Sequence, residues 1–322
     1  MTACSGVGGA EEKAGPLGDK MDFHDPSDAF GAMTWEKAEG EQLSLALSFA
    51  LNKRNYGYSD VDVIFSGDLQ NQCTASAHGI CPTGIPYIGL YASCSTCTEG
   101  LLLASLCMGY PEIRRAAAVT GSHNCAAERQ FRLPLEYGGQ RSPTAGWTAT
   151  AAGAFLVERE KENALARICR VMPGKMVDGG IKDAGNMGAA MAPAAADSIF
   201  SFLSQTGQSP EDYDAIVTGD LGYVGSALLW DLLKENGMDI RSVHKDCGCM
   251  IYDKKKQDVH AGGSGCGCSA LALAAHFLPY LRERVYRKIL FLSTGALMSP
   301  SSVAQGESVI GIAPLLELSA PD

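Results

Sequence analysis

The sequence has few basic residues, few aromatic residues and no long apolar run. Its 322 residues include 26 Lys and Arg against 36 Asp and Glu, a formal net charge of −10. Nucleic-acid-binding proteins present a basic face to the phosphate backbone, so we expect no nucleic-acid partner. Aromatic residues make up only 7% while glycine occurs 37 times, which indicates many tight turns and close backbone contacts.

The sequence also lacks a membrane-spanning segment and a secretory signal. The best apolar candidate, residues 270–281, is shorter than the roughly 20 residues of a span and contains His276 and Pro279. The first residues lack the basic region and apolar stretch of a signal peptide. We therefore expect no transmembrane segment and no secretion. For a chain inside the cell, 12 cysteines predict buried apolar side chains rather than a disulfide framework.

What is present is the alternation of strands and helices that is typical of an α/β protein. The first 30 residues are predicted as loop, and Thr34 as the N-cap of the first helix. The predicted helices span residues 34–52, 93–108, 193–205 and 269–280. The predicted strands span residues 61–65, 87–91, 116–120, 151–158, 166–172, 215–218, 288–293 and 309–318. This order favours mostly parallel or mixed sheets with helices between and outside them.

The sequence contains an internal repeat. Residues 60–69 align with residues 212–221 at an offset of 152, and six of the ten positions are identical. Two further pairs match at an offset of 174, namely Cys94-Ser95 with Cys268-Ser269 and Thr120-Gly121 with Thr294-Gly295. Ordered matches of this kind predict a duplicated unit, with chance similarity of two strand–turn segments as the alternative. We accordingly divide the chain into an N-terminal half, residues 1–163, and a C-terminal half, residues 164–322.

Several segments resemble a known family. A duplicated α/β chain with Cys94 at a helix start, directly after residues 87–93, resembles the thiolase superfamily. Within it the chain is similar, over nearly its whole length, to the family of stage V sporulation protein AD. Four segments carry this resemblance: residues 122–132, 136–140, 186–197 and 262–266. The family pattern begins with further residues that include a first strand, so Met1 is expected to fall inside that strand.

The resemblance implies both a fold and a function. The implied fold is a duplicated thiolase-like αβαβα arrangement in five layers with mixed sheets, usually as a homodimer. The implied role is to bind dipicolinic acid (pyridine-2,6-dicarboxylate), alone or as its calcium chelate, and to assist its uptake into the developing spore. The implied partners are membrane proteins of the same sporulation operon. The chain would lie in the cytoplasm or peripherally at the spore inner membrane. No cofactor is expected other than calcium bound together with dipicolinate.

Cys94 is the candidate for chemistry. At a helix start, unpaired backbone N–H groups and the helix dipole lower the pKa of a thiol. In thiolase-like enzymes this position is the acyl-accepting nucleophile, and the second half supplies a His base and an Asn or second His. Here Asp220 follows the corresponding strand, and Ser264, Gly265 and Cys266 stand in the later glycine-rich loop. This argues against condensation and favours a retained pocket used for binding.

Dipicolinate is a flat dianion that needs helix N-termini or basic side chains for its carboxylates and apolar faces for its ring. His123 and Asn124 follow a strand end, where α/β pockets form. Arg129 is predicted either as a carboxylate clamp or as the structural partner of Glu128 or Glu136. The predicted ligand-binding residues are Cys94, Ser95, His123, Asn124, Arg129, Met187, Asp220, Ser264 and Gly265.

The cysteine-rich segments allow other interpretations. Cys94 and Cys97 have the CxxC spacing of redox motifs, although the length and the duplication disagree with a thioredoxin-like domain. Residues 247–249 and 266–268 hold two Cys-Gly-Cys pairs whose spacers are tighter than those of zinc knuckles. Residues 262–267 lack the lysine of a phosphate-binding loop, so a close backbone crossing at the pocket floor is favoured. We predict no metal site.

Three functions stay open at this point. The first is a non-catalytic binding protein for dipicolinate. The second is an acyltransferase with Cys94 as nucleophile and Asp220 or His123 as base. The third is a scaffold that holds partner proteins and keeps only a vestigial pocket. His244 and His260 are predicted as surface residues, because they lie in a polar stretch that is rich in lysine.

Overall fold

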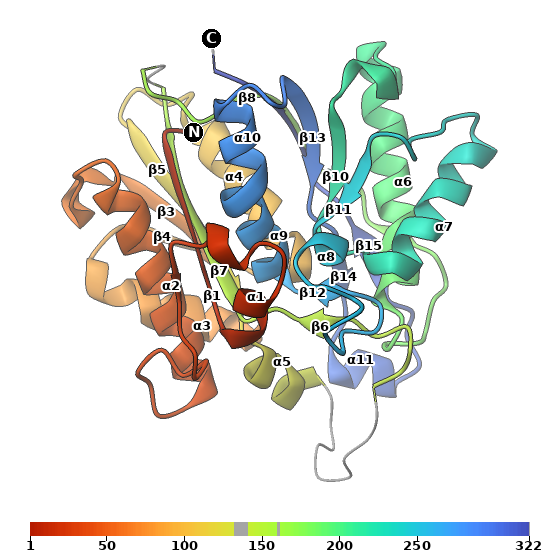
Figure 1. Ribbon diagram of the computed structural model, residues 1–322, viewed down its shortest axis with the longest axis horizontal. Coiled ribbons are helices and arrows are strands. Elements are labelled where there is room, and N and C mark those ends of the chain that lie inside the picture. The colour runs from red at the N-terminus through yellow and green to blue at the C-terminus, as the bar shows by residue number, and fades with distance from the viewer. Residues whose placement is uncertain (132–140, 160–161, 322) are drawn as a thin grey trace.

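The computed structural model describes residues 1–131, 141–159 and 162–321. Within these residues two mixed sheets are separated and flanked by helices (Figure 1). The first sheet is built from residues 3–158 and the second from residues 167–319. The two sheets therefore fall on either side of the boundary proposed from the sequence.

The first sheet has the described strand order β2-β1-β7-β5-β3-β4. β7 is antiparallel to both of its neighbours, and β3 is parallel to β5 and β4. The strands are β1 (Ala3–Gly8), β2 (Phe23–His24), β3 (Val63–Gly67), β4 (Tyr87–Leu90), β5 (Arg115–Ser122) and β7 (Ala151–Glu158).

The second sheet has the described order β11-β10-β13-β16-β8. β16 is antiparallel to both of its neighbours, and β10 is parallel to β13 and β11. The strands are β8 (Arg167–Met172), β10 (Ala215–Thr218), β11 (His244–Asp246), β13 (Lys288–Leu292) and β16 (Leu315–Ser319). The two sheets share the order and direction of five strands. In the first sheet these are β1, β7, β5, β3 and β4, and their counterparts in the second are β8, β16, β13, β10 and β11. The internal repeat of the sequence is therefore also a repeat of topology.

Three layers of helices alternate with the two sheets, so the structure confirms the predicted five-layer arrangement (Figure 1). One pair packs outside the first sheet, a second pair lies between the sheets, and a third pair packs outside the second sheet. In that order the pairs are α2 (Trp35–Asn52) with α3 (Thr74–Ile80), α4 (Thr96–Cys107) with α9 (Cys266–Ala272), and α6 (Met187–Thr206) with α7 (Gly222–Glu235).

Shorter elements fill the ends of these layers. β6 (Trp147–Thr148) pairs in parallel with β12 (Gly263–Ser264) and so joins the two halves. β14 (Gly295–Leu297), β15 (Ile310–Ile312) and β9 (Val177–Asp178) form a further small sheet. The shorter α-helices are α1 (Ala10–Ala14), α5 (Asn124–Phe131), α8 (Cys247–Met250), α10 (Leu278–Arg282) and α11 (Pro300–Ala304). Among the described residues, no helix has the length and apolar character of a membrane span.

Local sequence accounts for the first long helix. Thr34 caps α2, because its hydroxyl accepts a hydrogen bond from the Lys37 backbone N–H at 3.3 Å. Leu43 and Leu47 recur on one face and are fully buried against the first sheet. A Cβ on Gly40 would lie 3.0 Å from the Ala75 carbonyl oxygen, so this glycine lets α2 and α3 approach closely.

Several predicted elements differ from the structure. Residues 1–30 are not loop, because β1 is an interior strand of the first sheet and every one of its residues is buried. α6 begins six residues before Pro193, since the Asn186 side chain accepts from the Ala189 backbone N–H and caps the helix there. The predicted last strand, 309–318, is two strands in different sheets, β15 and β16. α7 was not predicted at all.

Candidate functional site

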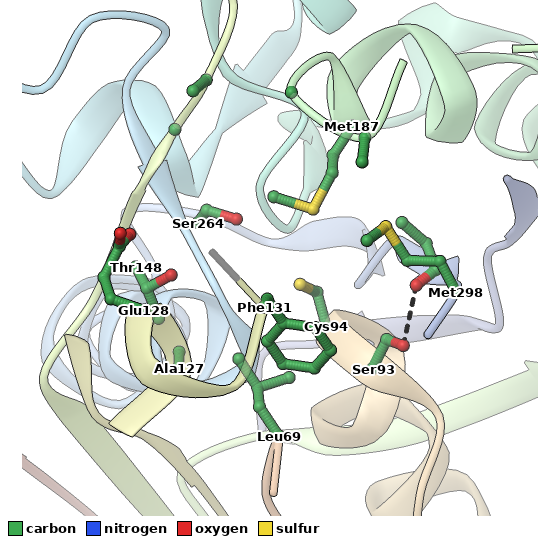
Figure 2. Close-up of a pocket in the computed structure, with 15 residues that line it drawn as sticks. Leu69, Ser93, Cys94, Ala127, Glu128, Phe131, Thr148, Met187, Ser264 and Met298 are labelled. Carbon is green, nitrogen blue, oxygen red and sulfur yellow. Dashed lines mark hydrogen bonds between the residues drawn. The ribbon is translucent and has the colours of Figure 1, made fainter. Parts of the chain in front are cut away.

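A cavity of about 220 Å³ lies where the two halves meet (Figure 2). Its walls come from both halves, with Leu69 and Phe131 from the first and Met187 and Met298 from the second. Most lining side chains are apolar. Among the described lining residues the one charged side chain is Glu128, and none is Lys, Arg or His. The cavity therefore suits a small, largely apolar surface such as one ring, and it is smaller than the roughly 300–1,000 Å³ of pockets for drug-sized ligands.

Cys94 stands in the short helical turn of Ser93–Ser95 that leads into α4. Ser93 has a positive φ of 53°, a strained conformation for a residue with a Cβ. Its hydroxyl donates to the Ala296 carbonyl oxygen at 2.8 Å, which ties this turn to the other half. As a result the Cys94 sulfur points into the cavity, where Figure 2 shows it facing Met187 and Ser264.

Asp220 lies directly behind this wall of the cavity. One of its oxygens accepts the Gly265 backbone N–H at 2.9 Å and the Ser264 hydroxyl at 3.3 Å. The other oxygen accepts the Thr294 hydroxyl at 3.0 Å. Burial raises the pKa of the Asp220 carboxyl to about 7, against the hydrogen bonds from Cys94 and these other donors that lower it.

The surroundings of the Cys94 thiol disfavour its ionised form. Burial, followed by the nearby Asp220 carboxylate, raises its pKa well above the usual range of a thiol. The helix start predicted the opposite direction. The prediction is wrong because Cys94 is almost completely removed from water and its hydrogen-bonding neighbour is an acid, not a cation.

The glycine-rich loop at residues 262–267 approaches the pocket floor as a close backbone crossing, as predicted. Gly265 has φ of 93°, and a Cβ there would lie 2.7 Å from the Ser122 hydroxyl oxygen. A Cβ on Gly267 would lie 2.0 Å from the Ala151 carbonyl oxygen. Glycine is required at both positions, and the tight path brings the Gly265 N–H to Asp220.

Comparison with known proteins identifies the family. The sequence pattern described as "Stage V sporulation protein AD" matches residues 1–319. The chain belongs to the stage V sporulation protein AD family. It is 40% identical over 305 residues to stage V sporulation protein AD of Bacillus subtilis (strain 168), covering 95% of this chain and 89% of that protein.

Solved structures show the same fold at low identity. Cerulenin-bound OleA from Xanthomonas campestris superposes with a TM-score of 0.61 at 14% identity, covering 99% of this chain and 98% of that one. The 3-oxoacyl-[acyl-carrier-protein] synthase III of Aquifex aeolicus VF5 gives a TM-score of 0.56 at 13% identity and 98% coverage of each chain. This member of the stage V sporulation protein AD family therefore has a thiolase-like fold.

The structure brings six of the nine predicted site residues together in this family member. Cys94, Met187 and Ser264 line the cavity. Asp220 and Gly265 form the layer behind them. Ser95 is fully buried beside Cys94, where its hydroxyl donates to the Ala92 carbonyl oxygen at 2.7 Å rather than toward the cavity.

The other three predicted residues lie elsewhere. His123 is buried with Nε2 2.8 Å from the Asp28 carbonyl oxygen and its ring against Trp35. The Asn124 amide donates to the Thr148 carbonyl oxygen at 3.1 Å. Arg129 is exposed, pairs with Glu36 at 2.9 Å and does not line the cavity. Its proposed partner Glu136 lies outside the described residues, as does Arg132.

Two histidines predicted on the surface are partly buried. His244 is part of strand β11, where its Nδ1 accepts from the Trp230 indole N–H at 2.9 Å and its Nε2 lies 2.9 Å from the Thr218 hydroxyl. Burial lowers its pKa to about 4, so the ring is neutral. His260 Nδ1 lies 2.8 Å from the Ser142 carbonyl oxygen. Neither residue lines the cavity, and the polar sequence around them concealed these partners.

In the described part of the chain the cysteines form neither a disulfide nor a cluster with other potential metal ligands. All 12 are free, including Cys94 and Cys97. Across the described ranges, no group of three or more His, Cys, Asp or Glu side chains is placed to hold a metal ion. Asp68, the repeat counterpart of Asp220, accepts the Gln70 and Ser76 backbone N–H groups at 2.7 Å each and so acts as a loop cap.

Sequence reasoning missed the apolar walls of the cavity. Leu69, Phe131 and Met298 carry no chemical signal of their own. Thr294, by contrast, holds Asp220 and is part of the internal repeat. The match of Thr120-Gly121 with Thr294-Gly295 in the internal repeat is therefore the sequence feature that could have pointed to Thr294 as a partner of Asp220.

Proposed function

We propose that this protein binds dipicolinate in the cavity beside Cys94 and assists its uptake into the developing spore, without condensing acyl groups. The family membership supplies the sporulation context. The observation that carries the non-catalytic part is the burial of Cys94 next to Asp220. The position of a nucleophile is kept, but burial and then the nearby Asp220 carboxylate raise the thiol pKa, so the thiolate that acyl transfer needs is disfavoured.

The cavity supports a ligand with one flat ring. Phe131 and Met187 offer apolar surface, and methionine side chains adapt to an aromatic face. Ser264 places a hydroxyl on the opposite wall (Figure 2). A pyridine ring between these walls, with one carboxylate toward Ser264 and Cys94, uses each of these groups.

The charge of the lining favours the calcium chelate as a second form of the ligand. Among the lining residues that the structure describes, none is Lys, Arg or His, so no basic side chain faces the ring site. Chelation neutralises the two ligand carboxylates, so the chelate needs no basic partner in the cavity, whereas the free dianion does. Calcium would then enter with the ligand rather than occupy a protein site.

The family membership also leads us to propose the wider setting. The partners would be the membrane proteins of the same sporulation operon, with this chain in the cytoplasm or peripherally at the spore inner membrane. It would act as a homodimer that hands ligand to those partners.

Calorimetric titration with dipicolinate, with and without calcium, tests the binding proposal. Benzene-1,3-dicarboxylate is the control ligand, since it keeps the shape but lacks the ring nitrogen. We expect saturable binding of dipicolinate that Met187→Ala weakens about tenfold, because burial of the ring against the methionine is lost. Met176→Ala, a change on the exposed surface, is the matched control and leaves the affinity unchanged. Absence of binding by folded wild-type protein in both forms of the ligand overturns the proposal.

One observation favours a second candidate, an acyltransferase. Asp220 lies beside the Cys94 thiol and is a carboxylate placed where a base would stand, whereas His123 does not line the cavity and its Nε2 lies 2.8 Å from the Asp28 carbonyl oxygen. Incubation with acetyl-CoA followed by mass spectrometry decides between the two. An acyl adduct on wild-type protein that is absent from Cys94→Ala replaces the binding proposal with this one. Silence toward both dipicolinate and acetyl-CoA leaves the scaffold function.

A further inference from the structure

Asp220 lies one layer behind the cavity and touches two side chains of its wall. We infer that Asp220 takes up a proton when the cavity binds a carboxylate ligand, and that this proton frees either Ser264 or Cys94 to donate a hydrogen bond to the ligand. The inference rests on the proposed function and deepens it, because it says how a site without a described basic residue accepts an anion.

The hydrogen-bond inventory of Asp220 carries the first step. An ionised carboxylate only accepts hydrogen bonds. The Ser264 hydroxyl and the Thr294 hydroxyl each have a single hydrogen, which each donates to Asp220 in this structure, and the Cys94 thiol lies beside the same carboxyl group. The Gly265 N–H is a further donor. While Asp220 is ionised, none of these hydrogens is available to a second acceptor.

The second step is the position of two of these donors. Ser264 and Cys94 both line the cavity, and Figure 2 shows their oxygen and sulfur atoms pointing into it. With its hydrogen turned toward Asp220, the Ser264 hydroxyl presents only lone pairs to the cavity, and the sulfur of Cys94 adds further lone pairs. A ligand carboxylate placed against them would meet these lone pairs and, just behind them, a second carboxylate in a site with little water.

Among the described residues, no Lys, Arg or His compensates the charge of Asp220. Its titratable neighbours are Cys94 before α4, Asp246 of β11, Cys247 of α8 and Cys268 of α9, all acids. Within the described residues, Asp220 makes no ion pair with a Lys, Arg or His. Burial raises its pKa to about 7, so near neutral pH the proton is exchanged at little cost.

The proton balance is simple. One proton passes from solvent to an Asp220 oxygen, and no covalent bond of the ligand changes. The protonated carboxyl donates to the Ser264 oxygen or the Cys94 sulfur, and the hydrogen of that group turns to the ligand carboxylate. The complex with a dianion then gains one negative charge in place of two.

Neither of the comparable buried acids can play this part. Asp246 accepts the backbone N–H groups of Leu221, Gly222 and Cys249, so it caps helix starts and does not line the cavity. Asp68, the repeat counterpart, caps the loop before α3. Asp220 alone among these three acids lies one hydrogen bond from the cavity.

Calorimetry of dipicolinate binding tests the inference. The titrations are run with a calcium chelator present, at about pH 6 and about pH 8, each in two buffers of different ionisation enthalpy. Above pH 6 both ligand carboxyls stay ionised, so proton uptake reports on the protein. We expect uptake of about one proton per ligand at the higher pH and about tenfold weaker binding there than at the lower pH.

Asp220→Asn is the decisive variant, because the amide has the shape of the neutral acid and cannot ionise. We expect the variant to bind equally well at both pH values without proton uptake. Asp239→Asn, at an exposed aspartate paired with Arg241, is the matched control and retains the wild-type coupling. Circular dichroism verifies that each variant is folded.

The outcomes separate the inference from the proposed function. Binding by the wild-type protein that is independent of pH and takes up no proton overturns the inference and leaves the function standing. Unchanged coupling in folded Asp220→Asn also overturns it. No binding by the wild-type protein at either pH overturns the inference, and it overturns the proposed function as well when the calcium chelate of dipicolinate also fails to bind. If the variant fails to fold, the two-buffer experiment on the wild-type protein still decides.

Discussion

At the scale of single residues, Glu12 is a second buried carboxyl group that joins distant segments. Its oxygens accept the Tyr252 hydroxyl, the Thr150 N–H at 3.0 Å and the Gly9 N–H at 3.1 Å. Burial raises its pKa to about 7 despite these three donors. The group is satisfied by hydrogen bonds, yet its ionisation near neutral pH has a thermodynamic effect on the whole fold.

This effect predicts that the protein loses stability as the pH rises from about 4.5 to 7. In that range native Glu12 keeps a proton that the unfolded chain has released, so the free energy of unfolding falls with increasing pH. Raising the pKa of Glu12 from 4.5 to about 7 lowers the free energy of unfolding by roughly 3 kcal/mol across this pH range. Urea unfolding at a series of pH values measures it. Glu12→Gln should flatten the curve, and the exposed Glu41→Gln should not; equal curves for the wild type and Glu12→Gln contradict the assignment.

Single residues also show the limits of predicting the site from the sequence. Cys94, Met187 and Ser264 carry recognisable chemistry or a family motif, and they do line the cavity. His123 and Asn124 also stand at a strand end, but a sequence does not tell to which side a chain turns after a strand. Arg129 is paired with Glu36, 93 positions away in the chain, a contact that spacing cannot reveal.

At the scale of elements, α6 and α7 cross at two glycines. A Cβ on Gly225 would lie 2.8 Å from the Gly188 carbonyl oxygen and 2.9 Å from its Cα. Such distances are impossible without moving a backbone. The crossing therefore requires glycine at both positions. A side chain at either one would strain the contact, as an added methyl group strains a well-packed core.

Gly225→Ala is predicted to lower the free energy of unfolding by about 1–3 kcal/mol, because the two helices must separate. The sign is informative, since alanine has the higher helix propensity and would otherwise stabilise α7. Gly100→Ala in α4 is the matched control, because its Cβ would meet neighbours at 3.4 Å, an ordinary contact. Thermal or urea unfolding measures both. Equal effects at the two positions would show that the crossing is not tight.

The elements that could be predicted are those with strong local patterns. The strand 151–158 and the strand 215–218 match β7 and β10 residue for residue, because both are short apolar runs between turns. β1 was missed because its residues, such as Gly6, are small; there a Cβ would lie 2.7 Å from Leu271 of α9. The lack of apolar bulk in β1 is a consequence of the helix packed on it, which only the fold shows.

At the scale of the whole molecule, β4 leaves the first sheet with an exposed edge. In the described part of the chain it pairs only with β3, at the border of the sheet (Figure 1). Tyr87 and Ile88 are exposed on it, 37% and 47% respectively. An apolar edge strand of this kind invites pairing with another chain, which is consistent with the homodimer that we propose.

We predict that the protein elutes at twice the mass of one chain and that Ile88→Lys converts it to a monomer, because a charge on the edge strand opposes pairing. Size-exclusion chromatography with light scattering measures this. Val285→Lys, at a similarly exposed position away from β4, is the control and keeps the wild-type mass. A wild-type monomer, or a dimer that withstands Ile88→Lys, excludes the β4 edge as the interface.

The short pairing of β6 with β12 has a consequence for how the protein is made. Thr148 and Ser264 are partners in that pairing, and both line the cavity. During synthesis the first sheet is complete once residue 158 has left the ribosome, more than 100 residues before Ser264 emerges. A partly synthesised chain can thus contain every strand of the first sheet and still lack part of the cavity wall. A ligand can therefore bind in the cavity only after both halves have been synthesised and have packed together.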